Sequence, residues 1–274
     1  MTAEGEVTAN DRCSSGPCVA QRTCPFPPLP KVGSEGAPRR PVIAVDVDEV
    51  LGHFVPQLCA FHNNTHGTEL TPDDFTSYYF HEVWGGTRAE ADDKMHDFFE
   101  SPYFLDGLPV VEGAAEVLRK HSETLELHVV TSRTNVLTEH TVWWIDANYP
   151  GVFADLHFGN HYGQGVARSK PDLCRAIDAV MMIDDNMHYA TQCAEAGIRT
   201  CLFGDYAWNR TSDALPENMY RTATWDDVDV HLRAVASGHR NAETTALPLP
   251  PPSTTSRENG DLSAWDSSQR EQAT

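Results

Sequence analysis

The sequence is poor in basic side chains and has no long apolar run. Lysine and arginine together number 20, against 40 aspartates and glutamates, so the 274-residue chain has a formal net charge of -20. Proteins that wrap nucleic acid need clustered Lys and Arg to neutralise phosphates, so the composition argues against a nucleic-acid polymer as a partner. No stretch approaches the roughly 18 consecutive apolar residues of a membrane span, and we expect no membrane association.

Cysteine is scarce, and its number is odd. The seven cysteines form no even disulfide framework. Four fall inside predicted elements and are expected to behave as small buried hydrophobes: Cys59, Cys174, Cys193 and Cys201. Three near the N-terminus match no zinc-binding spacing: Cys13, Cys18 and Cys24. The first residues are acidic and lack the apolar core of a secretory signal, so we expect a cytoplasmic protein in a reducing environment.

Composition divides the chain into three parts. Residues 1–40 are rich in Gly, Pro and Ser, with PFPPLP at their centre, and are predicted to be a disordered arm. Residues 238–274 contain LPLPPPSTTS followed by polar residues and are predicted to be a disordered tail. We therefore expect one folded domain over residues 41–237.

Within that domain, buried-strand patterns alternate with helical patterns. Apolar runs predict strands at 42–45, 125–130, 156–158, 180–183 and 198–203. Helical spacing of apolar residues predicts helices at 113–121, 136–149, 171–179, 187–196 and 224–235. This alternation predicts a doubly wound α/β fold, in which helices cover both faces of a parallel sheet.

One long segment, about residues 55–108, interrupts the alternation and is called the insertion below. It contains a helical pattern at 88–99 but no strong strand, and we interpret FHNNTHG at 61–67 as a loop. More than 50 residues exceed an ordinary connection, so we expect a small helical cap over the sheet edge that follows the first strand.

Polar side chains follow the predicted strands where each strand ends. Asp46 and Asp48 follow the first strand, Thr131 and Ser132 follow the second, Lys170 comes directly before a helix, and the fourth run ends at Asp184 and Asp185. Taken singly, each of these is an ordinary strand end, helix cap or solvated residue. Because ligands of open parallel sheets bind beyond the carboxyl ends of the strands, their common order predicts one site.

The chemistry of this set favours a phosphoryl group. Several carboxylates that meet at one point repel each other unless a cation joins them, and an all-oxygen set selects a hard ion such as Mg²⁺. A lysine and hydroxyls beside that ion would bind phosphate oxygens. A free carboxylate next to them can attack phosphorus and form an aspartyl-phosphate.

The segments DVDEV, VVTS, Lys170 and IDD resemble, in the same chain order, the four motifs of the haloacid dehalogenase (HAD) superfamily of phosphatases. The resemblance implies a HAD-like, Rossmann-like sheet with a cap after the first strand. It implies Asp46 as nucleophile, and Asp48 as general acid and base whose backbone carbonyl also binds Mg²⁺. It further implies Thr131, Ser132 and Lys170 as phosphate ligands, and carboxylates at Asp46, Asp184 and Asp185 on the metal.

The insertion resembles the small helical cap of the 5′(3′)-deoxyribonucleotidase type. That resemblance implies a small phosphorylated substrate such as a (deoxy)nucleoside monophosphate, with cap aromatics on the base; Phe75, Tyr79 and Trp84 are the candidates, beside Tyr78 and Phe80. Glu49 departs from the pattern, because many relatives have Gly there. Its charge keeps a second hypothesis open, a catalytically weak HAD-like binding or regulatory protein.

Two further alternatives concern the substrate and the class of protein. Sugar phosphates and phosphorylated proteins remain possible substrates. A receiver-type signalling domain also phosphorylates an aspartate beside Mg²⁺, Thr and Lys, but it resembles this chain less, because its acid pair comes first and the phosphorylated aspartate later. The sequence leaves the oligomeric state open.

Overall fold

The computed structural model describes residues 39–161 and 163–242. Its centre is a six-stranded sheet with the order β3-β2-β1-β4-β5-β6, in which every neighbouring pair is parallel. The strands are β1 (Val42–Val45), β2 (Glu126–Thr131), β3 (Asp155–Phe158), β4 (Ala179–Asp184), β5 (Arg199–Phe203) and β6 (Met219–Thr222). The predicted doubly wound parallel fold is therefore confirmed. The strand order reverses between β1 and β4, which is where such sheets bind ligands.

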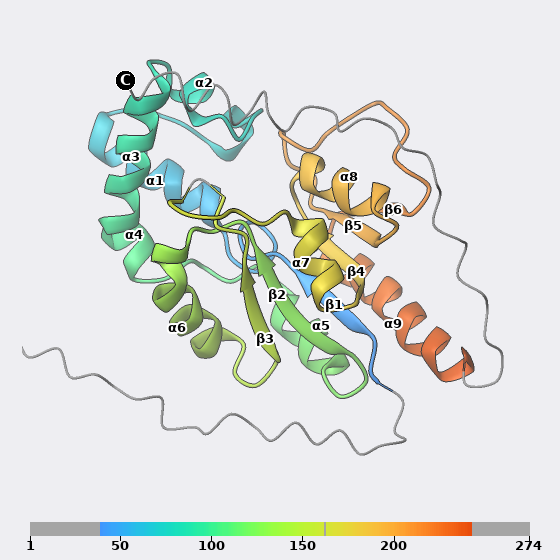
Figure 1. Cartoon of the computed structure of the whole chain (residues 1–274). Helices are drawn as coiled ribbons and strands as arrows, with labels where there is room; N and C mark the ends of the chain where they lie inside the picture. Colours follow the sequence, from blue (N-terminus) through green and yellow to red (C-terminus); the bar gives the residue numbers. More distant parts are fainter. Residues whose placement is uncertain (1–38, 162, 243–274) are drawn as a thin grey trace, which may run out of the picture. The chain divides into compact units, whose positions relative to one another are not determined.

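Helices cover both faces of the sheet, as Figure 1 shows. Side chains on alternate positions of β1 point to opposite faces, so that Ile43 and Val45 join one core cluster and Ala44 joins another. The larger cluster includes residues of α5 (Ala114–His121), α6 (Thr138–Asn148) and α9 (Trp225–Ala242). The smaller clusters include residues of α7 (Lys170–Ala176) and α8 (Met187–Glu195).

The insertion is helical and lies together at one end of the sheet (Figure 1). It contains α1 (Phe54–His66), η1 (Pro72–Asp74), α2 (Phe80–Trp84), α3 (Arg88–Glu100) and α4 (Pro102–Leu105). Aromatic side chains pack it internally: the Phe98 ring contacts those of Phe54, Phe61 and Phe104 at centroid distances of 5.3–5.6 Å. A short η2 (Asn135–Leu137) precedes α6. No helix of the described ranges is both long and apolar enough to cross a bilayer.

The structure differs from the sequence-based expectation at α1 and β6. FHNNTHG is the last helical turns of α1 and not a loop; the helix ends at Gly67, whose φ is +68°. Its polar residues are used in the structure, because the Asn63 side chain hydrogen-bonds to both the N–H and the carbonyl of Leu70. Strand β6, with the sequence MYRT, is too short and too polar to give a buried-strand pattern.

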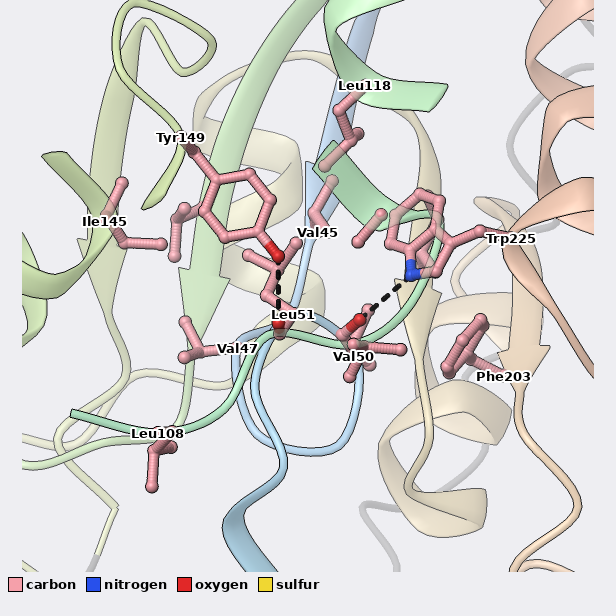
Figure 2. Packing of buried hydrophobic residues seen from close by; sticks show 14 of the residues in the cluster. Val45, Val47, Val50, Leu51, Leu108, Leu118, Ile145, Tyr149, Phe203 and Trp225 are labelled. Atoms are coloured by element: carbon pink, nitrogen blue, oxygen red, sulfur yellow. Dashed lines mark hydrogen bonds between the residues drawn. The ribbon is translucent and has the colours of Figure 1, made fainter. Parts of the chain in front are cut away.

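The turn after β1 is held by aromatic side chains that are distant in sequence (Figure 2). The Tyr149 hydroxyl donates to the Leu51 carbonyl at 2.8 Å, and the Trp225 indole N–H donates to the Val50 carbonyl at 3.0 Å. At Gly52, an added Cβ would lie 2.9 Å from the Trp144 ring, so only glycine fits there without movement. These contacts fix the backbone that carries Asp46 and Asp48.

We expect Tyr149→Phe and Trp225→Phe each to lower the free energy of unfolding by about 1–2 kcal/mol, because each removes a buried hydrogen bond to the backbone of this turn. Urea unfolding followed by circular dichroism measures this. Trp143→Phe is the matched control, because Trp143 is 50% exposed, and should change stability by less than about 0.5 kcal/mol. Equal stabilities for all three variants would contradict this account of the turn.

Candidate active site

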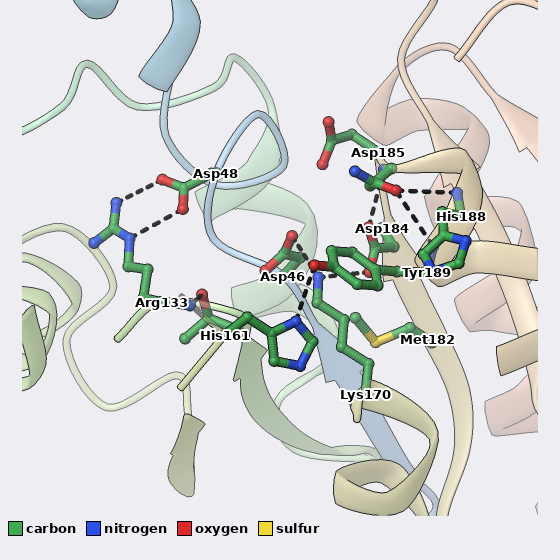
Figure 3. A network of polar contacts seen from close by, with 12 residues as sticks. Asp46, Asp48, Arg133, His161, Lys170, Met182, Asp184, Asp185, His188 and Tyr189 are labelled. Atoms are coloured by element: carbon green, nitrogen blue, oxygen red, sulfur yellow. Dashed lines mark hydrogen bonds and ion pairs between the residues drawn. The ribbon is translucent and has the colours of Figure 1, made fainter. Parts of the chain in front are cut away.

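Asp46, Lys170 and Asp184 form a buried ion-paired centre between β1 and β4 (Figure 3). Asp46 follows the last residue of β1, and its N–H continues the β1–β4 ladder by donating to the Ile183 carbonyl at 3.0 Å. The Lys170 ammonium lies 2.7 Å from Asp46 Oδ2 and 2.6 Å from Asp184 Oδ2. The sheet edge therefore brings together the three charged groups that the sequence places on separate segments.

Lys170 reaches this centre because α7 begins there. The Ser169 hydroxyl caps the helix by accepting from the Asp172 N–H, and Pro171 occupies the first turn. The Lys170 side chain is fully buried, and its ammonium lies 4.8 Å from the centroid of the Tyr189 ring. Burial alone would lower the pKa of Lys170, but Asp184 and Asp46 together raise it above its ordinary value. The lysine is therefore a permanent cation of the site.

Three carboxylates at the same place are suited to a divalent cation. One oxygen from each of Asp46, Asp184 and Asp185 lies within 4.8 Å of the others, and all three residues are buried. Asp46 Oδ1 is buried without a hydrogen-bond partner among the described residues. An all-oxygen donor set with one unsatisfied oxygen fits Mg²⁺ better than a softer ion.

The protonation of this cluster reflects its burial. Desolvation raises the pKa of Asp46 to about 7, with Asp184 and Asp48 adding to the effect and Lys170 opposing it. Burial, with the charges of Asp184 and Asp46, also raises the pKa of Asp185 well above its ordinary value. A cation among these carboxylates would compensate their negative charge and so lower their pKa values again.

Thr131 and Ser132 lie at the end of β2 and offer hydroxyls at the same edge. Thr131 is fully buried, and its Oγ1 accepts from the Arg133 N–H at 3.2 Å, which leaves its own proton free to be donated. Ser132 Oγ is buried and has no hydrogen-bond partner among the residues that the structure describes. Both hydroxyls can therefore donate to an anion.

The Asp48 side chain is separate from the three metal-suited carboxylates. Figure 3 shows its carboxylate turned toward Arg133, whose Nε and Nη2 donate to the two oxygens at 3.0 and 2.6 Å. The same guanidinium donates to Thr141 Oγ1 at 3.0 Å and lies 5.3 Å from the Phe104 ring centroid. The pairing of Arg133 with Asp48 has no local signal in the sequence.

The aromatic candidates of the insertion occupy different environments. Phe75 is 1% exposed and belongs to the main core cluster, and its ring packs edge-on against those of Phe80 and Trp84. Trp84 stacks on Phe80 and on His62, whereas Tyr79 is 45% exposed. The structure thus gathers Phe75 and Trp84 into the packing of the insertion and leaves Tyr79 at the surface.

Tyr78 is the aromatic residue of the insertion that reaches the carboxylate cluster. Its hydroxyl donates to Asp185 Oδ2, and the Trp208 indole N–H donates to the same oxygen at 2.8 Å. Trp208 comes from the loop between β5 and β6, where the sequence carries no motif that points to the site. Trp208 is therefore a candidate residue of the site that the sequence analysis did not identify.

Glu49 is a buried structural residue. Its backbone is left-handed, with φ of +58°, a conformation that favours Gly over residues with a Cβ. Its carboxylate accepts from the Val55 N–H at 2.5 Å in the first turn of α1, where the N-cap residue His53 provides no side-chain cap. Burial raises the pKa of Glu49, against the opposing effects of His53 and that N–H. Glu49 therefore caps α1.

Comparison with known proteins supports an enzymatic interpretation of this site. A family model described as 5′ nucleotidase, deoxy (pyrimidine), cytosolic type C protein matches residues 40–237. No curated protein matches the sequence.

Solved structures share the fold at low sequence identity. A predicted phosphatase from Clostridium acetobutylicum superposes with a TM-score of 0.52 at 13% identity, covering 71% of this chain and 99% of its own. A predicted β-phosphoglucomutase from Thermotoga maritima has a TM-score of 0.50 at 15% identity, with 71% and 99% covered. A predicted haloacid dehalogenase-like hydrolase from Bacteroides fragilis has a TM-score of 0.50 at 15% identity, with 68% and 98% covered. These likenesses confirm the HAD-like fold.

The left-handed backbone at Glu49 predicts an unusual order of stabilities. Glu49→Ala and Glu49→Gly both remove the cap of α1, but only alanine keeps the strain of a Cβ at φ of +58°. We expect Glu49→Ala to be less stable than Glu49→Gly by about 1 kcal/mol, measured by urea unfolding. An alanine variant as stable as the glycine variant would show that this backbone relaxes when the carboxylate is removed.

Proposed function

The chain belongs to the 5′ nucleotidase, deoxy (pyrimidine), cytosolic type C family, a phosphatase family of the HAD-like fold, and from this premise we propose a specific reaction. It is a magnesium-dependent hydrolysis of phosphate monoesters through an aspartyl-phosphate on Asp46, with nucleoside monophosphates as the preferred substrates. The family description includes the word cytosolic, which supports the cytoplasmic location that we expect.

The observation that carries this proposal is the shared ammonium of Lys170 between Asp46 and Asp184. One cation cannot balance three buried carboxylates when all are ionised, and the site would still have to admit a phosphate dianion. A divalent cation on Asp46, Asp184 and Asp185 resolves both difficulties. When bound, Mg²⁺ would supply charge compensation for the phosphate oxygens.

The residues divide the work of the first chemical step. Lys170 and the hydroxyls of Thr131 and Ser132 hold the phosphate oxygens. One carboxylate oxygen of Asp46 attacks the phosphorus; the Asp46–phosphorus bond forms as the bond to the leaving oxygen breaks. Asp48 gives a proton to that oxygen, and the alcohol departs.

The second step returns the enzyme to its starting state. Asp48, now ionised, takes a proton from a water molecule, and this water attacks the phosphorus of the aspartyl-phosphate. The Asp46–phosphorus bond breaks, inorganic phosphate forms, and Asp48 holds the proton again. One residue thus acts as acid and then as base.

Arg133 orients Asp48 for both steps. A bidentate guanidinium occupies one lone pair on each carboxylate oxygen, and a carboxylate has about four such acceptor sites. The remaining lone pairs can exchange a proton with the substrate while the two hydrogen bonds from Arg133 stay in place. Thr141 and Phe104 contact the guanidinium itself. Arg133 is therefore fixed in place and can hold the Asp48 carboxylate in one orientation.

The insertion, about residues 55–108, serves as the cap of this site. Tyr78 brings it into contact with Asp185, so a closed insertion excludes water from the carboxylates. Nucleoside monophosphates are proposed on the strength of the family description. The exposed Tyr79 is the candidate that could reach a base by a side-chain rotation, whereas Phe75 is held in the core.

A panel of nucleoside monophosphates and sugar phosphates, assayed for released phosphate with and without Mg²⁺, tests the proposal. We expect magnesium-dependent release that is fastest with nucleoside monophosphates and falls by at least about 10³-fold in Asp46→Asn, because the nucleophile is lost. Appreciable activity in Asp46→Asn would refute the nucleophile assignment. Magnesium binding without turnover on any substrate would favour the catalytically weak binding protein.

Loss of the Arg133 fork is expected to slow the chemistry without weakening binding. Arg133→Lys keeps one positive charge but cannot hold both oxygens of Asp48, so kcat should fall by about 10- to 100-fold while KM and Mg²⁺ affinity change little. Steady-state kinetics and calorimetry measure these quantities. Arg175→Lys, at a side chain that is 59% exposed on α7, is the matched control. A change in KM alone would instead make Arg133 a substrate ligand.

A further inference from the structure

We propose that Tyr78 and Trp208 are positioning residues for Asp185, and that they couple docking of the insertion to binding of the divalent cation. The inference rests on the proposed function, because it takes Asp185 as a ligand of that cation. It goes further in assigning a role to two aromatic side chains outside the four motifs, one in the insertion and one in the loop between β5 and β6.

Both donors act on the same oxygen of Asp185. The Tyr78 hydroxyl and the Trp208 indole N–H converge on Oδ2, and within residues 39–161 and 163–242 they are the two donors to this carboxylate. They fix the plane of the carboxylate and leave Oδ1 available as a ligand atom. Outer donors of this kind commonly orient metal ligands.

The two donors come from segments that are distant in the sequence. Tyr78 lies in the insertion between η1 and α2, and Trp208 lies in the loop between β5 and β6. Their rings also touch edge to face, with centroids 5.5 Å apart. When the insertion is docked, the Tyr78 ring therefore contacts the Trp208 ring directly.

The Trp208 side of this contact is rigidly supported. Its ring stacks on that of Tyr206 at 4.5 Å, and the Tyr206 hydroxyl donates to the Glu49 carbonyl at 2.9 Å. The neighbouring Asn209 amide donates both to the Asp185 carbonyl and to the Phe203 carbonyl, each at 2.9 Å. The loop is thus bonded to the turn after β1 and to the ends of β4 and β5.

The insertion makes few polar contacts with the loop between β5 and β6. Apart from Tyr78, the contact includes an ion pair of 3.7 Å between Arg210 and Asp73, whose side chains are 53% and 82% exposed. Exposed pairs of this kind contribute little. The Tyr78 hydroxyl is the donor and Asp185 Oδ2 the acceptor of the one hydrogen bond described between the insertion and this carboxylate. The Tyr78–Asp185 hydrogen bond is therefore the polar contact that links this part of the insertion to the carboxylate cluster.

Thermodynamic linkage predicts how docking of the insertion and binding of the cation affect each other. If the docked insertion orients Asp185 for the cation, then the cation must favour the docked insertion by the same factor. Mg²⁺ should therefore slow amide hydrogen exchange in residues 72–84. Removing the Tyr78 hydroxyl should abolish this response and weaken Mg²⁺ binding together.

The test measures Mg²⁺ affinity by calorimetry and hydrogen exchange of residues 72–84 in the full chain. In Tyr78→Phe we expect the Kd for Mg²⁺ to rise about tenfold, and the magnesium-induced protection to disappear. Trp208→Phe, which keeps an aromatic ring but loses the N–H, should also raise the Kd. Tyr103→Phe is the control: Tyr103 packs on Phe61 within the insertion, and its variant should bind Mg²⁺ like the wild type.

The outcomes separate this inference from the proposed function. If the wild type binds Mg²⁺ and hydrolyses substrate while both variants bind and exchange like the wild type, the inference is wrong and the proposed function stands. Tighter Mg²⁺ binding by Tyr78→Phe would overturn it too, because the hydroxyl would then compete with the cation. A wild type that binds no Mg²⁺ would refute the magnesium site together with the coupling.

Discussion

The buried ammonium of Lys170 is the interaction on which the site depends. Asp46 follows β1 and Asp184 ends β4, and because these strands are neighbours, the sheet brings their buried carboxylates together. Removing a buried charge from between two others leaves them uncompensated, which is far more costly than losing a surface pair. The lysine can lie there only because α7 begins at that edge with a capped N-terminus. The buried ion pairs thus require both that β1 and β4 are neighbours and that α7 begins at the same edge of the sheet.

The parts of the site that sequence reasoning could predict are those carried by local patterns. An apolar run that ends in a polar residue fixes both a strand and the edge at which that residue lies, so Asp46, Thr131, Asp184 and Asp185 could be placed without a structure. The fold followed from the same pattern. By contrast, α1 ends in polar residues that bond to the following loop, and β6 is a short edge strand, so neither leaves an apolar signature. The roles proposed for these residues remain predictions.

Pairings between side chains that are distant in the sequence could not be predicted from it. Arg133 and Asp48 are 85 positions apart, and Tyr78 and Asp185 are 107 apart; nothing in either local sequence specifies its partner. Glu49 shows the reverse case. As a sequence feature it was an additional negative charge beside the catalytic pair, but its carboxylate is turned into the start of α1. A charge that caps a helix helps to build the site, and its presence is no argument against turnover.

The two acids that follow β1 and β4 are therefore supported in different ways, and the difference matches what each is proposed to do. Asp48 must exchange a proton, and its partner Arg133 is anchored on α6 and α4, so its position does not depend on a single donor. Asp185 is proposed to hold a cation, and its partners are neutral donors, which orient a carboxylate without supplying the positive charge that the cation would bring. A charged partner there would repel the ion. Neutral aromatic donors on Asp185 are thus the arrangement that electrostatics favours for a metal ligand, whereas the guanidinium on Asp48 fixes the position of the proposed proton carrier.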